Sequence, residues 1–584
     1  MSSNGSLSLK VSPSAHKPIV RKTKKHRPIY SADFETITHA PTRVWLWGAI
    51  DTAEADDGQL HWGTDIESFF EHCQRENARY DFFNLKFDGH FMVDWLLKAG
   101  YQHVELNPED GPPHKGQFSI SMAAMGGKFY SLIIGWPNGV VTEFWDAAKK
   151  FPANMGVRGV AKAYKLDVSK GEMDYHKERH AGYQPDAEEL DYLDRDVRII
   201  AKALAILFAQ DMKKMTTGAD ALAAYKDIVG GNKAFRQVFP LLSEDIDAEI
   251  RKAYRGGWTY LADRFKMKQL GCGLVLDVNS LYPSVMYYEP IPYGEPVHVD
   301  GLPKTNARYP LSIFTVTFTA KLRKNHVPCI QIKGTSIFGA TEYLSEIRQP
   351  TMITVTSVDW ELYNEQYEID VLAFHDGYLF KAATGMFNAY IDKWMAIKAT
   401  TTGGQREAAK SQLVNLYGKF ATNPDVTGKI PVLDGELVKY VRGTEQKKDP
   451  VYTAAGVFIT AHARAKTIRA AQANYHRFVY ADTDSLHMLG TEWPTGILIH
   501  PSDLGAWKFE YYFTEALYVR SKVYLEREIT CGRMRTAFAG LPKAVAANLT
   551  FDDIWDGHEI PGKLQPVSVE GGIVLKDVTY TVKL

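Results

Sequence analysis

The stretch Tyr480–Ser485 reads YADTDS and places two carboxylates, Asp482 and Asp484, two residues apart within the apolar run FVYADTDSLHML. We expect this run to form one strand, in which side chains at i and i+2 share a face, so both acids point the same way. Two like charges held that close repel unless a cation neutralises them, which predicts a divalent-metal site. Asp-Thr-Asp is also ordinary hairpin-turn chemistry, and for the motif alone this alternative stays open.

Two segments upstream of this motif carry complementary chemistry. The apolar run in GLVLDVNSLYPSVM delivers Asp277 at its end, as a strand ending in a carboxylate would. In EAAKSQLVNLYGKF, the residues Lys410, Val414 and Tyr417 recur at i, i+4 and i+7 and share one helical face. A cation and an aromatic ring on one face suit a nucleotide, because the ammonium pairs with phosphate and the ring packs against a base. Taken alone, a lysine on a helix is usually solvated and a tyrosine usually packs in the core. The evidence for function is therefore the order of the three segments, an acidic strand, a helix with a lysine and a tyrosine, and the acid pair of YADTDS.

Composition sets outer bounds on the class of protein. With 584 residues and 45% hydrophobic content, the chain can bury several cores, roughly three to five domains. No apolar run approaches the ~20 residues that span a bilayer, and no apolar signal-peptide core is present, so we expect a cytoplasmic protein without membrane association. The four cysteines lack CxxC spacing, which indicates neither a zinc ribbon nor a disulfide framework.

Charge is balanced over the chain but concentrated near its start. The chain has 68 Lys+Arg against 69 Asp+Glu, so any channel for nucleic acid must come from segregated charge. Residues 1–28 include a run of cations with few large apolar residues, which predicts a basic disordered tail. A tag and a nonspecific DNA tether are both compatible with it.

A second group of acids lies in the N-terminal third of the chain. Three segments contribute pairs of polar side chains: Asp33 with Glu35 in SADFETIT, Asn84 with Asp88 in NLKFDGHF, and Tyr192 with Asp196 in YLDRD. Carboxylates from three segments can hold two metal ions about 3.5–4 Å apart, one activating water and the other stabilising a leaving oxygen. For DFET alone, a helix N-cap or a turn is the alternative.

Together these segments resemble a known family. SLYPS, Lys410 with the following LYG, and YADTDS are similar to motifs A, B and C of the family B DNA polymerases. The longer runs NLYGKFATNPDVTGK, KDPVYTAAGVFITAHAR and NLKFDGHF resemble the protein-primed, phi29-type phage polymerases, from about residue 30 to the C-terminus. The resemblance implies an α/β and α+β multidomain fold. It would combine a ribonuclease H-like 3′–5′ exonuclease domain with a right-hand polymerase of palm, fingers and thumb that carries two insertions.

The same resemblance gives the expected domain boundaries. After the tail we expect an exonuclease domain at 29–216, palm at 217–288, a first insertion at 289–385 that docks a terminal protein, fingers at 386–422, a second insertion at 423–450, palm again at 451–537 and thumb at 538–584. Within the second insertion, GKIPVL and ELVKYV flank Asp434-Gly435, a strong hairpin signal. In the family this hairpin helps to close a tunnel around DNA and to displace a strand; a surface hairpin without function is the alternative.

The resemblance also implies the residues of the polymerase site. Asp277 and Asp484 would bind two Mg²⁺ ions, with Asp482 assisting. The expected nucleotide-binding residues are Val278, which also contributes to the metal site, Tyr282, Lys398, Arg406, Lys410 and Tyr417. The expected DNA-binding residues are Tyr254, Gly256 and Gly257 of a YxGG element, and Lys522 and Tyr524 of a KxY motif, the last two on one strand face. Val414 replaces the family's asparagine, and YxGG alone is also compatible with a plain flexible turn.

For the exonuclease site the resemblance implies a further set. Asp33, Glu35, Asp88 and Asp196 would bind metal, Tyr192 would orient water, and Lys170 would be an auxiliary catalytic residue. The expected ligands of single-stranded DNA are Thr36, Asn84 and Phe87. Phe83 stands where the family often has histidine, and its ring remains able to stack on a base.

The sequence therefore predicts a DNA-directed DNA polymerase that replicates linear phage-type DNA from a protein primer, with 3′–5′ proofreading and strand displacement. The expected cofactor is Mg²⁺, with Mn²⁺ as a substitute, at two ions per site. The expected partners are DNA template and primer, dNTPs and a terminal protein, the chain being monomeric or a heterodimer with that protein. Alternatives are a clamp-dependent family B polymerase, disfavoured by the two insertions, and a decayed DNA-binding homologue, disfavoured by the complete carboxylate set.

Overall fold

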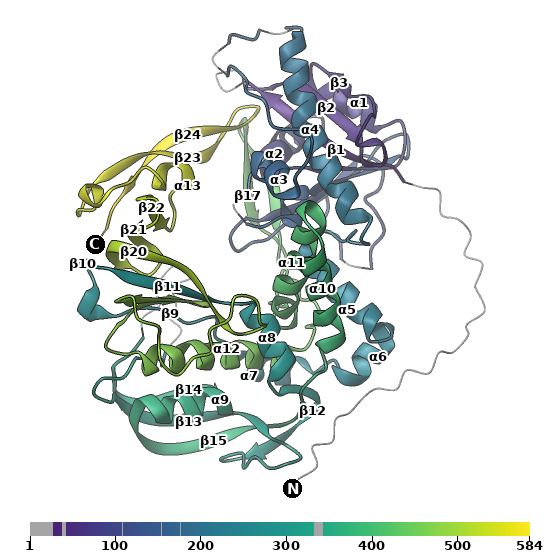
Figure 1. Cartoon of the computed structure of the whole chain (residues 1–584). Helices are drawn as coiled ribbons and strands as arrows, with labels where there is room; N and C mark the ends of the chain where they lie inside the picture. The colour runs from purple at the N-terminus through teal and green to yellow at the C-terminus, as the bar shows by residue number, and fades with distance from the viewer. Residues whose placement is uncertain are drawn as a thin grey trace.

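The computed structural model describes residues 27–37, 42–107, 109–153, 155–175, 177–180, 182–331 and 343–583 (Figure 1). The predicted basic tail at 1–28 lies outside the described residues except for its last two positions. Among the described residues, no helix is both long and apolar enough to cross a membrane.

An eight-stranded sheet forms the first unit, here called the N-terminal sheet. Its strand order is β3-β2-β1-β4-β8-β7-β6-β5, with β1, β4 and β8 parallel to one another. The strands are β1 Ile29–Thr36, β2 Val44–Asp51, β3 His61–Gly63, β4 Ala78–Phe82, β5 Gln102–His103, β6 Gln117–Met122, β7 Phe129–Gly135 and β8 Val141–Asp146. The helices are α1 Ile66–Cys73, α2 Leu85–Lys98, α3 Val157–Tyr164 and α4 Ala187–Phe208. A capping box of Asp186 and Glu189 starts α4, which packs on β1 and β2.

Three helices lead to a second sheet, here called the central sheet. The helices are α5 Thr217–Ile228, α6 Gly231–Val238 and α7 Glu244–Lys252. The strand order is β22-β21-β20-β11-β19-β18-β9, with β10 beside β20. The strands are β9 Thr259–Leu261, β10 Gln269–Leu270, β11 Gly273–Val278, β18 Phe478–Asp482, β19 Ser485–Leu489, β20 Trp507–Arg520, β21 Val523–Glu528 and β22 Met534–Phe538. Strand β11 thus lies between two strands that come some 200 residues later in the chain.

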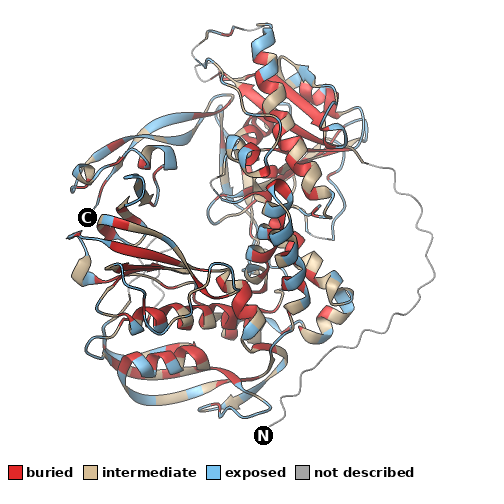
Figure 2. Cartoon of the chain, viewed as in Figure 1, coloured by how far each residue is buried: buried red, intermediate tan, exposed pale blue. Residues whose placement is uncertain are grey.

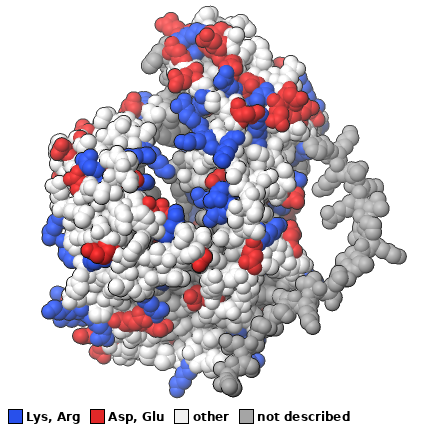
Figure 3. Space-filling view, in the orientation of Figure 1, with Lys and Arg blue, Asp and Glu red and all other residues white. Residues whose placement is uncertain are grey.

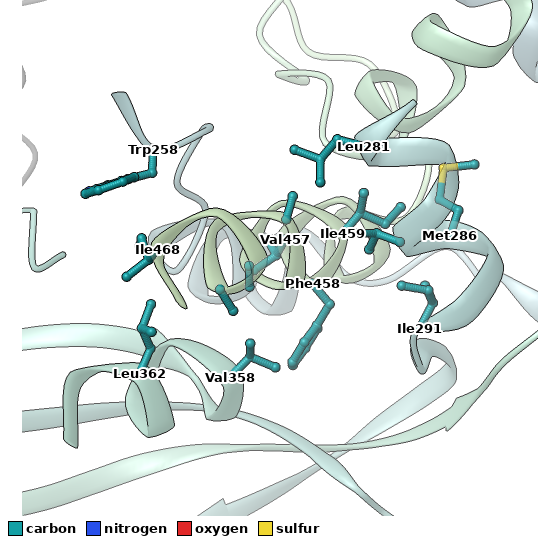
Figure 4. Packing of buried hydrophobic residues seen from close by; sticks show 14 of the residues in the cluster. Trp258, Leu281, Met286, Ile291, Val358, Leu362, Val457, Phe458, Ile459 and Ile468 are labelled. Carbon is teal, nitrogen blue, oxygen red and sulfur yellow. The ribbon is translucent and has the colours of Figure 1, made fainter. Parts of the chain in front are cut away.

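Helix α12, Thr453–Ala473, joins the central sheet to its surroundings. It is buried along most of its length because small residues in TAAGVFITAHARAKTIRAAQA let neighbours approach on several sides (Figure 2). Phe458 points toward Val358 of α9, and Leu281 of α8 (Leu281–Tyr288) lies across the helix from it (Figure 4). A Cβ on Gly456 would lie 2.5 Å from the Ala421 Cβ, so glycine is needed there. The largest hydrophobic core of the chain is centred on this helix.

Below α12 lies a four-stranded antiparallel sheet, here called the insertion sheet, with strand order β12-β15-β13-β14 (Figure 1). It comprises β12 Ile291–Asp300, β13 Leu311–Leu322, β14 Glu346–Thr356 and β15 Tyr367–Ala383, with α9 Ser357–Gln366 packed on it. Next come α10 Asn388–Thr400 and α11 Gly403–Phe420, here called the helical pair. The insertion sheet falls within residues 289–385, the range expected for the first insertion, and the helical pair falls within 386–422, the range expected for the fingers.

The hairpin signal at Asp434-Gly435 corresponds to β16 Lys429–Asp434 and β17 Leu437–Arg442. Asp434 pairs with Leu437, so the loop residues are Gly435 and Glu436, one position later than the dipeptide suggested. Gly435 has φ +62°, as the first loop residue of a type II′ turn requires. This β16–β17 hairpin is packed rather than free, since Val438 is 6% exposed and belongs to the core of the N-terminal sheet.

The chain ends in β23 Glu559–Val569 and β24 Gly572–Thr581, here called the C-terminal hairpin, preceded by α13 Lys543–Ala546. The tip of this hairpin reaches the N-terminal sheet: Ile573 is buried in that core, and a Cβ on Gly572 would lie 2.3 Å from the Phe91 ring. Between the C-terminal hairpin and the N-terminal sheet the surface is hollowed, and lysines and arginines lie along the edge of this hollow (Figure 3). A nucleic-acid channel in a chain with balanced charge needs a local concentration of positive charge, and this face carries one.

Candidate active sites

The central sheet brings Asp277 next to the YADTDS motif. Asp277 lies near the end of β11 and pairs with Ser485 of β19. Asp482 ends β18 and also pairs with Ser485, so Thr483 and Asp484 form a two-residue turn, with Thr483 at φ +64°. The prediction that both acids lie along one strand is wrong, and the hairpin-turn alternative describes the motif correctly. The alternation of apolar and polar residues predicts a strand but does not show where a two-residue turn divides the run into two strands.

Backbone hydrogen bonds hold this turn against β11. The Val278 N–H donates to the Asp484 carbonyl oxygen at 2.8 Å, and the Thr483 N–H donates to the Trp258 carbonyl oxygen at 2.8 Å. A Cβ on Gly257 would lie 2.4 Å from Thr483 Oγ1, whereas one on Gly256 would meet open space. Gly257 is therefore needed for the close approach of the Thr483 turn, a packing role that differs from the DNA contact expected for it.

The three acids of this site differ in their electrostatic surroundings. Burial, then Asp484 and then Glu510, raise the pKa of Asp277 to about 7. Burial, and also Asp482, raise the pKa of Asp484. Only Asp482 of the three forms an ion pair among the described residues, with Lys522 Nζ at 2.6 Å, and it also accepts a hydrogen bond from Thr259 at 2.9 Å. Asp277 and Asp484 are thus two desolvated carboxylates that form no direct ion pair among the described residues.

Such a pair suits a hard divalent cation, which prefers oxygen ligands and offsets both the burial and the mutual repulsion. Within the part of the chain that the structure describes, no three His, Cys, Asp or Glu side chains gather closely enough to enclose a metal ion by themselves. A cation at Asp277 and Asp484 would therefore complete its coordination with backbone oxygen, water or phosphate. This incomplete cage is the arrangement expected where the substrate brings ligands of its own.

The KxY residues lie beside this site but not on one strand face. Lys522 precedes β21 in a left-handed conformation, φ +61°, and its N–H donates to the Tyr480 hydroxyl at 3.0 Å. Tyr524 lies inside β21, and its ring packs on Tyr480 and Tyr518 with centroids 5.3 Å apart in each pair. The prediction of a shared strand face is wrong because the strand begins only at Val523. The Lys522 backbone N–H and the Tyr524 ring instead both contact Tyr480, while the Lys522 ammonium pairs with Asp482.

Helices α8 and α11 present aromatic rings to the same region. Tyr282 and Tyr417 stack with ring centroids 3.7 Å apart and planes inclined by 16°. Val414 is 48% exposed, on the same outer side of α11 as Lys410. The Asn415 amide donates back to the Ser411 carbonyl oxygen at 2.8 Å, so it does not replace an amide at position 414.

Cations gather on the helical pair. The Arg406 guanidinium donates to the Lys398 carbonyl oxygen at 2.6 Å. Burial, then the charges of Arg406 and Lys410, lower the pKa of Lys398. None of the three forms an ion pair among the described residues, although the charge of Glu407 partly offsets the effect of the cluster on Lys398. A polyanion would relieve the mutual repulsion.

The N-terminal sheet carries the second acid group. Asp33 and Glu35 lie on β1, Asp88 on α2 and Asp196 on α4. Burial and then Asp196 raise the pKa of Asp33 to about 7, and burial followed by Asp33 raises the pKa of both Glu35 and Asp88. The buried Oδ1 of Asp196 has no hydrogen-bond partner among the described residues. The four predicted acids thus lie near enough to influence one another's pKa, although no three of their side chains, within the part of the chain that the structure describes, are close enough to enclose a metal ion.

Two aromatic or basic neighbours complete this second site. Lys170 forms an ion pair with Asp196 Oδ2, and its Nζ lies 5.1 Å from the Tyr192 ring centroid. The Tyr192 hydroxyl lies 2.9 Å from the Tyr175 hydroxyl. Sequence reasoning missed Tyr175, because a single tyrosine in a loop carries no pattern.

The rim of the second site is built at the start of α2. Asn84 adopts φ +70°, and its N–H donates to Asp146 Oδ1 at 3.0 Å. Asp146 was also missed, although an acid that ends a buried strand is a recognisable signal. Thr36 ends β1 and Phe87 lies half-buried in α2. Phe83 packs on Phe151, with centroids 5.9 Å apart, so its ring is committed to the core near α3 and α4.

Comparison with known proteins places this geometry in a family. The model of DNA polymerase type B, organellar and viral, matches residues 138–497. The DNA polymerases of Bacillus phages Nf and phi29 are each 40% identical to the chain, over 95% and 96% of it and 100% of their own length. The DNA polymerase of Streptococcus phage Cp-1 is 26% identical over 95% of the chain and 98% of its own.

A solved structure agrees with these relatives. Phi29 DNA polymerase complexed with primer-template DNA and incoming nucleotide substrates superimposes with a TM-score of 0.89 at 39% identity, covering 96% of this chain and 100% of that one. The chain belongs to the type B DNA polymerases, within the phi29-type phage group. The predicted family, the mixed α/β multidomain fold and DNA-directed DNA polymerase activity are confirmed.

The contrast between the paired glycines gives a matched prediction. We expect Gly257→Ala to lower the free energy of unfolding by about 1–3 kcal/mol, because its Cβ overlaps Thr483 Oγ1. Gly256→Ala should stay within about 0.5 kcal/mol of the parent, since its Cβ meets open space. Urea unfolding followed by tryptophan fluorescence measures both, and equal losses for the two variants would contradict the packing role.

Proposed function

We propose that this polymerase extends DNA at the site of Asp277 and Asp484, removes 3′-terminal nucleotides at the second acid group, starts synthesis on a terminal protein and displaces the strand ahead. The observation that carries the division of labour is the placement of two desolvated acid groups on two separate sheets. Family membership supports the use of divalent metal ions. We assign Mg²⁺, with Mn²⁺ as a substitute, at two ions per site.

In the polymerase site, Asp277, Asp484 and the Val278 backbone would hold the ions, while Asp482 fixes Lys522. When bound there, such ions would supply Lewis-acid chemistry, lowering the pKa of the attacking hydroxyl and offsetting charge on the phosphoryl group. Lys398, Arg406 and Lys410 draw the triphosphate to the helical pair because they form no ion pair among the described residues. The stacked Tyr282 and Tyr417 lie where sugar and base would enter, and the bulk of the Tyr282 ring would reject a 2′-hydroxyl.

DNA would be held on either side of this site. Tyr254, Gly256 and Gly257 precede the central sheet and would contact the template, with Gly257 also seating the Thr483 turn. Lys522 and Tyr524 would hold the primer terminus, which the bond from the Lys522 N–H to Tyr480 helps to position. Lysines and arginines at the hollow between the C-terminal hairpin and the N-terminal sheet supply the counter-charge for the duplex (Figure 3).

In the exonuclease site, Asp33, Glu35, Asp88 and Asp196 would hold the metal ions. Tyr192, braced by Tyr175, would orient the attacking water, and Lys170 would stabilise charge near Asp196. Thr36, Asn84 and Phe87 would bind the single-stranded 3′ end at the rim. Asp146 fixes the left-handed backbone of Asn84 and so positions its amide.

The remaining units take accessory roles within the expected boundaries. The insertion sheet (289–385) would dock the terminal protein, to give a monomer or a heterodimer with it. The β16–β17 hairpin (423–450) would close the path of the template, with the thumb (538–584) opposite. Packing supports this: Tyr440 lies 5.1 Å from the His90 ring, and Thr444 Oγ1 donates to Glu105 at 2.8 Å. These contacts anchor the hairpin on the N-terminal unit, which argues against a surface hairpin without function.

Priming is tested directly with a terminal protein. We expect that protein, labelled dNTP and Mg²⁺ or Mn²⁺ to give label covalently attached to the terminal protein, resistant to boiling in detergent. Asp484→Ala should abolish the signal while leaving terminal-protein binding intact. If the enzyme extends an ordinary DNA primer but labels no phi29-type terminal protein, protein priming is contradicted. The DNA polymerase activity is not affected by that result.

The two sites should be separable, because their acids lie on different sheets. Asp33→Ala with Glu35→Ala should lower degradation of single-stranded 3′ ends by at least about 10³-fold, by analogy with loss of an essential electrostatic group, and leave primer extension within about threefold. Asp277→Ala should do the reverse. Gel assays of both activities on the same preparations provide the measurement, and loss of both activities in either variant would count against two sites.

The β16–β17 hairpin should control long synthesis rather than chemistry. Asp425 and Lys447 form a β-bridge, so a short Gly/Ser linker can replace residues 425–447 without separating their flanks. Single-nucleotide addition should remain near normal, whereas synthesis through duplex and long synthesis from one binding event should collapse. Exonuclease activity serves as the folding control. Full-length products from a singly primed circle, with enzyme below template, would show that the hairpin is dispensable.

A further inference from the structure

Lys508 lies opposite Asp277 on the side of β11 away from YADTDS. The two residues are partners in the antiparallel β11–β20 ladder, so their side chains project from the same face of the central sheet. The register then shifts: Leu276 pairs with Phe509 and Val275 with Tyr511, which leaves Glu510 as the extra residue of a bulge. Bulges recur next to active sites because they redirect a side chain.

Lys508 is held loosely. Its Nζ lies 2.7 Å from Glu510 Oε1, with the two side chains 43% and 36% exposed. An ion pair that open to solvent is weak because water screens it, so releasing the ammonium costs little. Lys508 is therefore available to a stronger anion that enters the site.

The charge of Lys508 acts on both walls of the polymerase site. On the sheet, it partly offsets the effects of burial, Asp484 and Glu510 that together raise the pKa of Asp277. On the helical pair, it adds to burial, Arg406 and Lys410 in lowering the pKa of Lys398. The ammonium is thus near enough to the acids and to the positive cluster to act on both. The three cations of the positive cluster, Lys398, Arg406 and Lys410, all come from α10 and α11, so they reach a triphosphate from one side only.

We propose that Lys508 is a phosphate-binding residue of the polymerase site: its ammonium pairs with Glu510 in the nucleotide-free protein and transfers to the β- or γ-phosphate of the incoming nucleotide. As a flexible point charge, lysine suits an exchange between carboxylate and phosphate. The same contact holds pyrophosphate after bond formation, and re-pairing with Glu510 favours its release. The inference rests on the proposed nucleotide site.

The test is nucleotide binding without chemistry. A dideoxy-terminated primer–template, Ca²⁺ and the complementary dNTP are titrated against the Asp33→Ala, Glu35→Ala protein, with fluorescence reporting the Kd. We expect Lys508→Ala to raise the Kd about 5- to 20-fold, as loss of one charge-assisted contact does. Lys508→Arg should stay within threefold. Glu510→Gln, which frees the ammonium, should leave the Kd unchanged or lower.

The matched control is Arg348→Ala, which removes the cation of an i, i+2 strand pair with Glu346 at 2.8 Å on the insertion sheet. Its Kd should equal that of the parent. The inhibition constant of inorganic pyrophosphate should rise in Lys508→Ala in parallel with the dNTP Kd. An unchanged Kd in Lys508→Ala, or a Glu510→Gln loss as large as that of Lys508→Ala, would overturn the proposal. If the parent itself fails to bind dNTP, the proposed nucleotide site fails instead.

Discussion

The pairing of β11 with β19 is the constraint on which the rest of the structure depends. It brings together segments from positions 273–278 and 485–489 and places Asp277 beside the Thr483-Asp484 turn. Both carboxylates are desolvated and repel each other, an unfavourable arrangement that only the surrounding packing maintains. Helix α12 supplies that packing from below, and the Val278 bond to Asp484 fixes the spacing. The repulsion between the two buried carboxylates therefore persists at a place where a divalent cation can offset it.

Charge elsewhere in the molecule is arranged around this constraint. Lys522 neutralises Asp482, so the polymerase site keeps two open acids, Asp277 and Asp484, rather than three. Lys398, Arg406 and Lys410 form no ion pair among the described residues, which leaves the site complementary to a metal-bound polyanion. The second acid group repeats the same principle on the N-terminal sheet, where burial again raises the pKa of the carboxyls. Separate sheets allow the two chemistries to coexist without sharing ligands.

Sequence alone predicted most of the chemistry and less of the local geometry. The acids, the exposed face of α11 with Lys410 and Val414, and the β16–β17 hairpin follow from residue type and short-range spacing. The turn at Thr483 could not be predicted, because a strand and a tight hairpin place i and i+2 acids at the same sequence spacing. Lys508 was invisible for a different reason: its role depends on the β11–β20 register, and strand partners far apart in sequence leave no local pattern.

The central claim is that Asp277 and Asp484, but not Asp482, bind the catalytic cations. Mn²⁺ binding in the Asp33→Ala, Glu35→Ala background, measured by electron paramagnetic resonance with primer–template and dNTP present, tests it most directly. We predict that Asp484→Asn weakens Mn²⁺ binding at least about tenfold, a loss of roughly 1.4 kcal/mol, while Asp482→Asn changes it less than threefold because Lys522 already neutralises that carboxylate. Equal losses in the two variants would contradict the account.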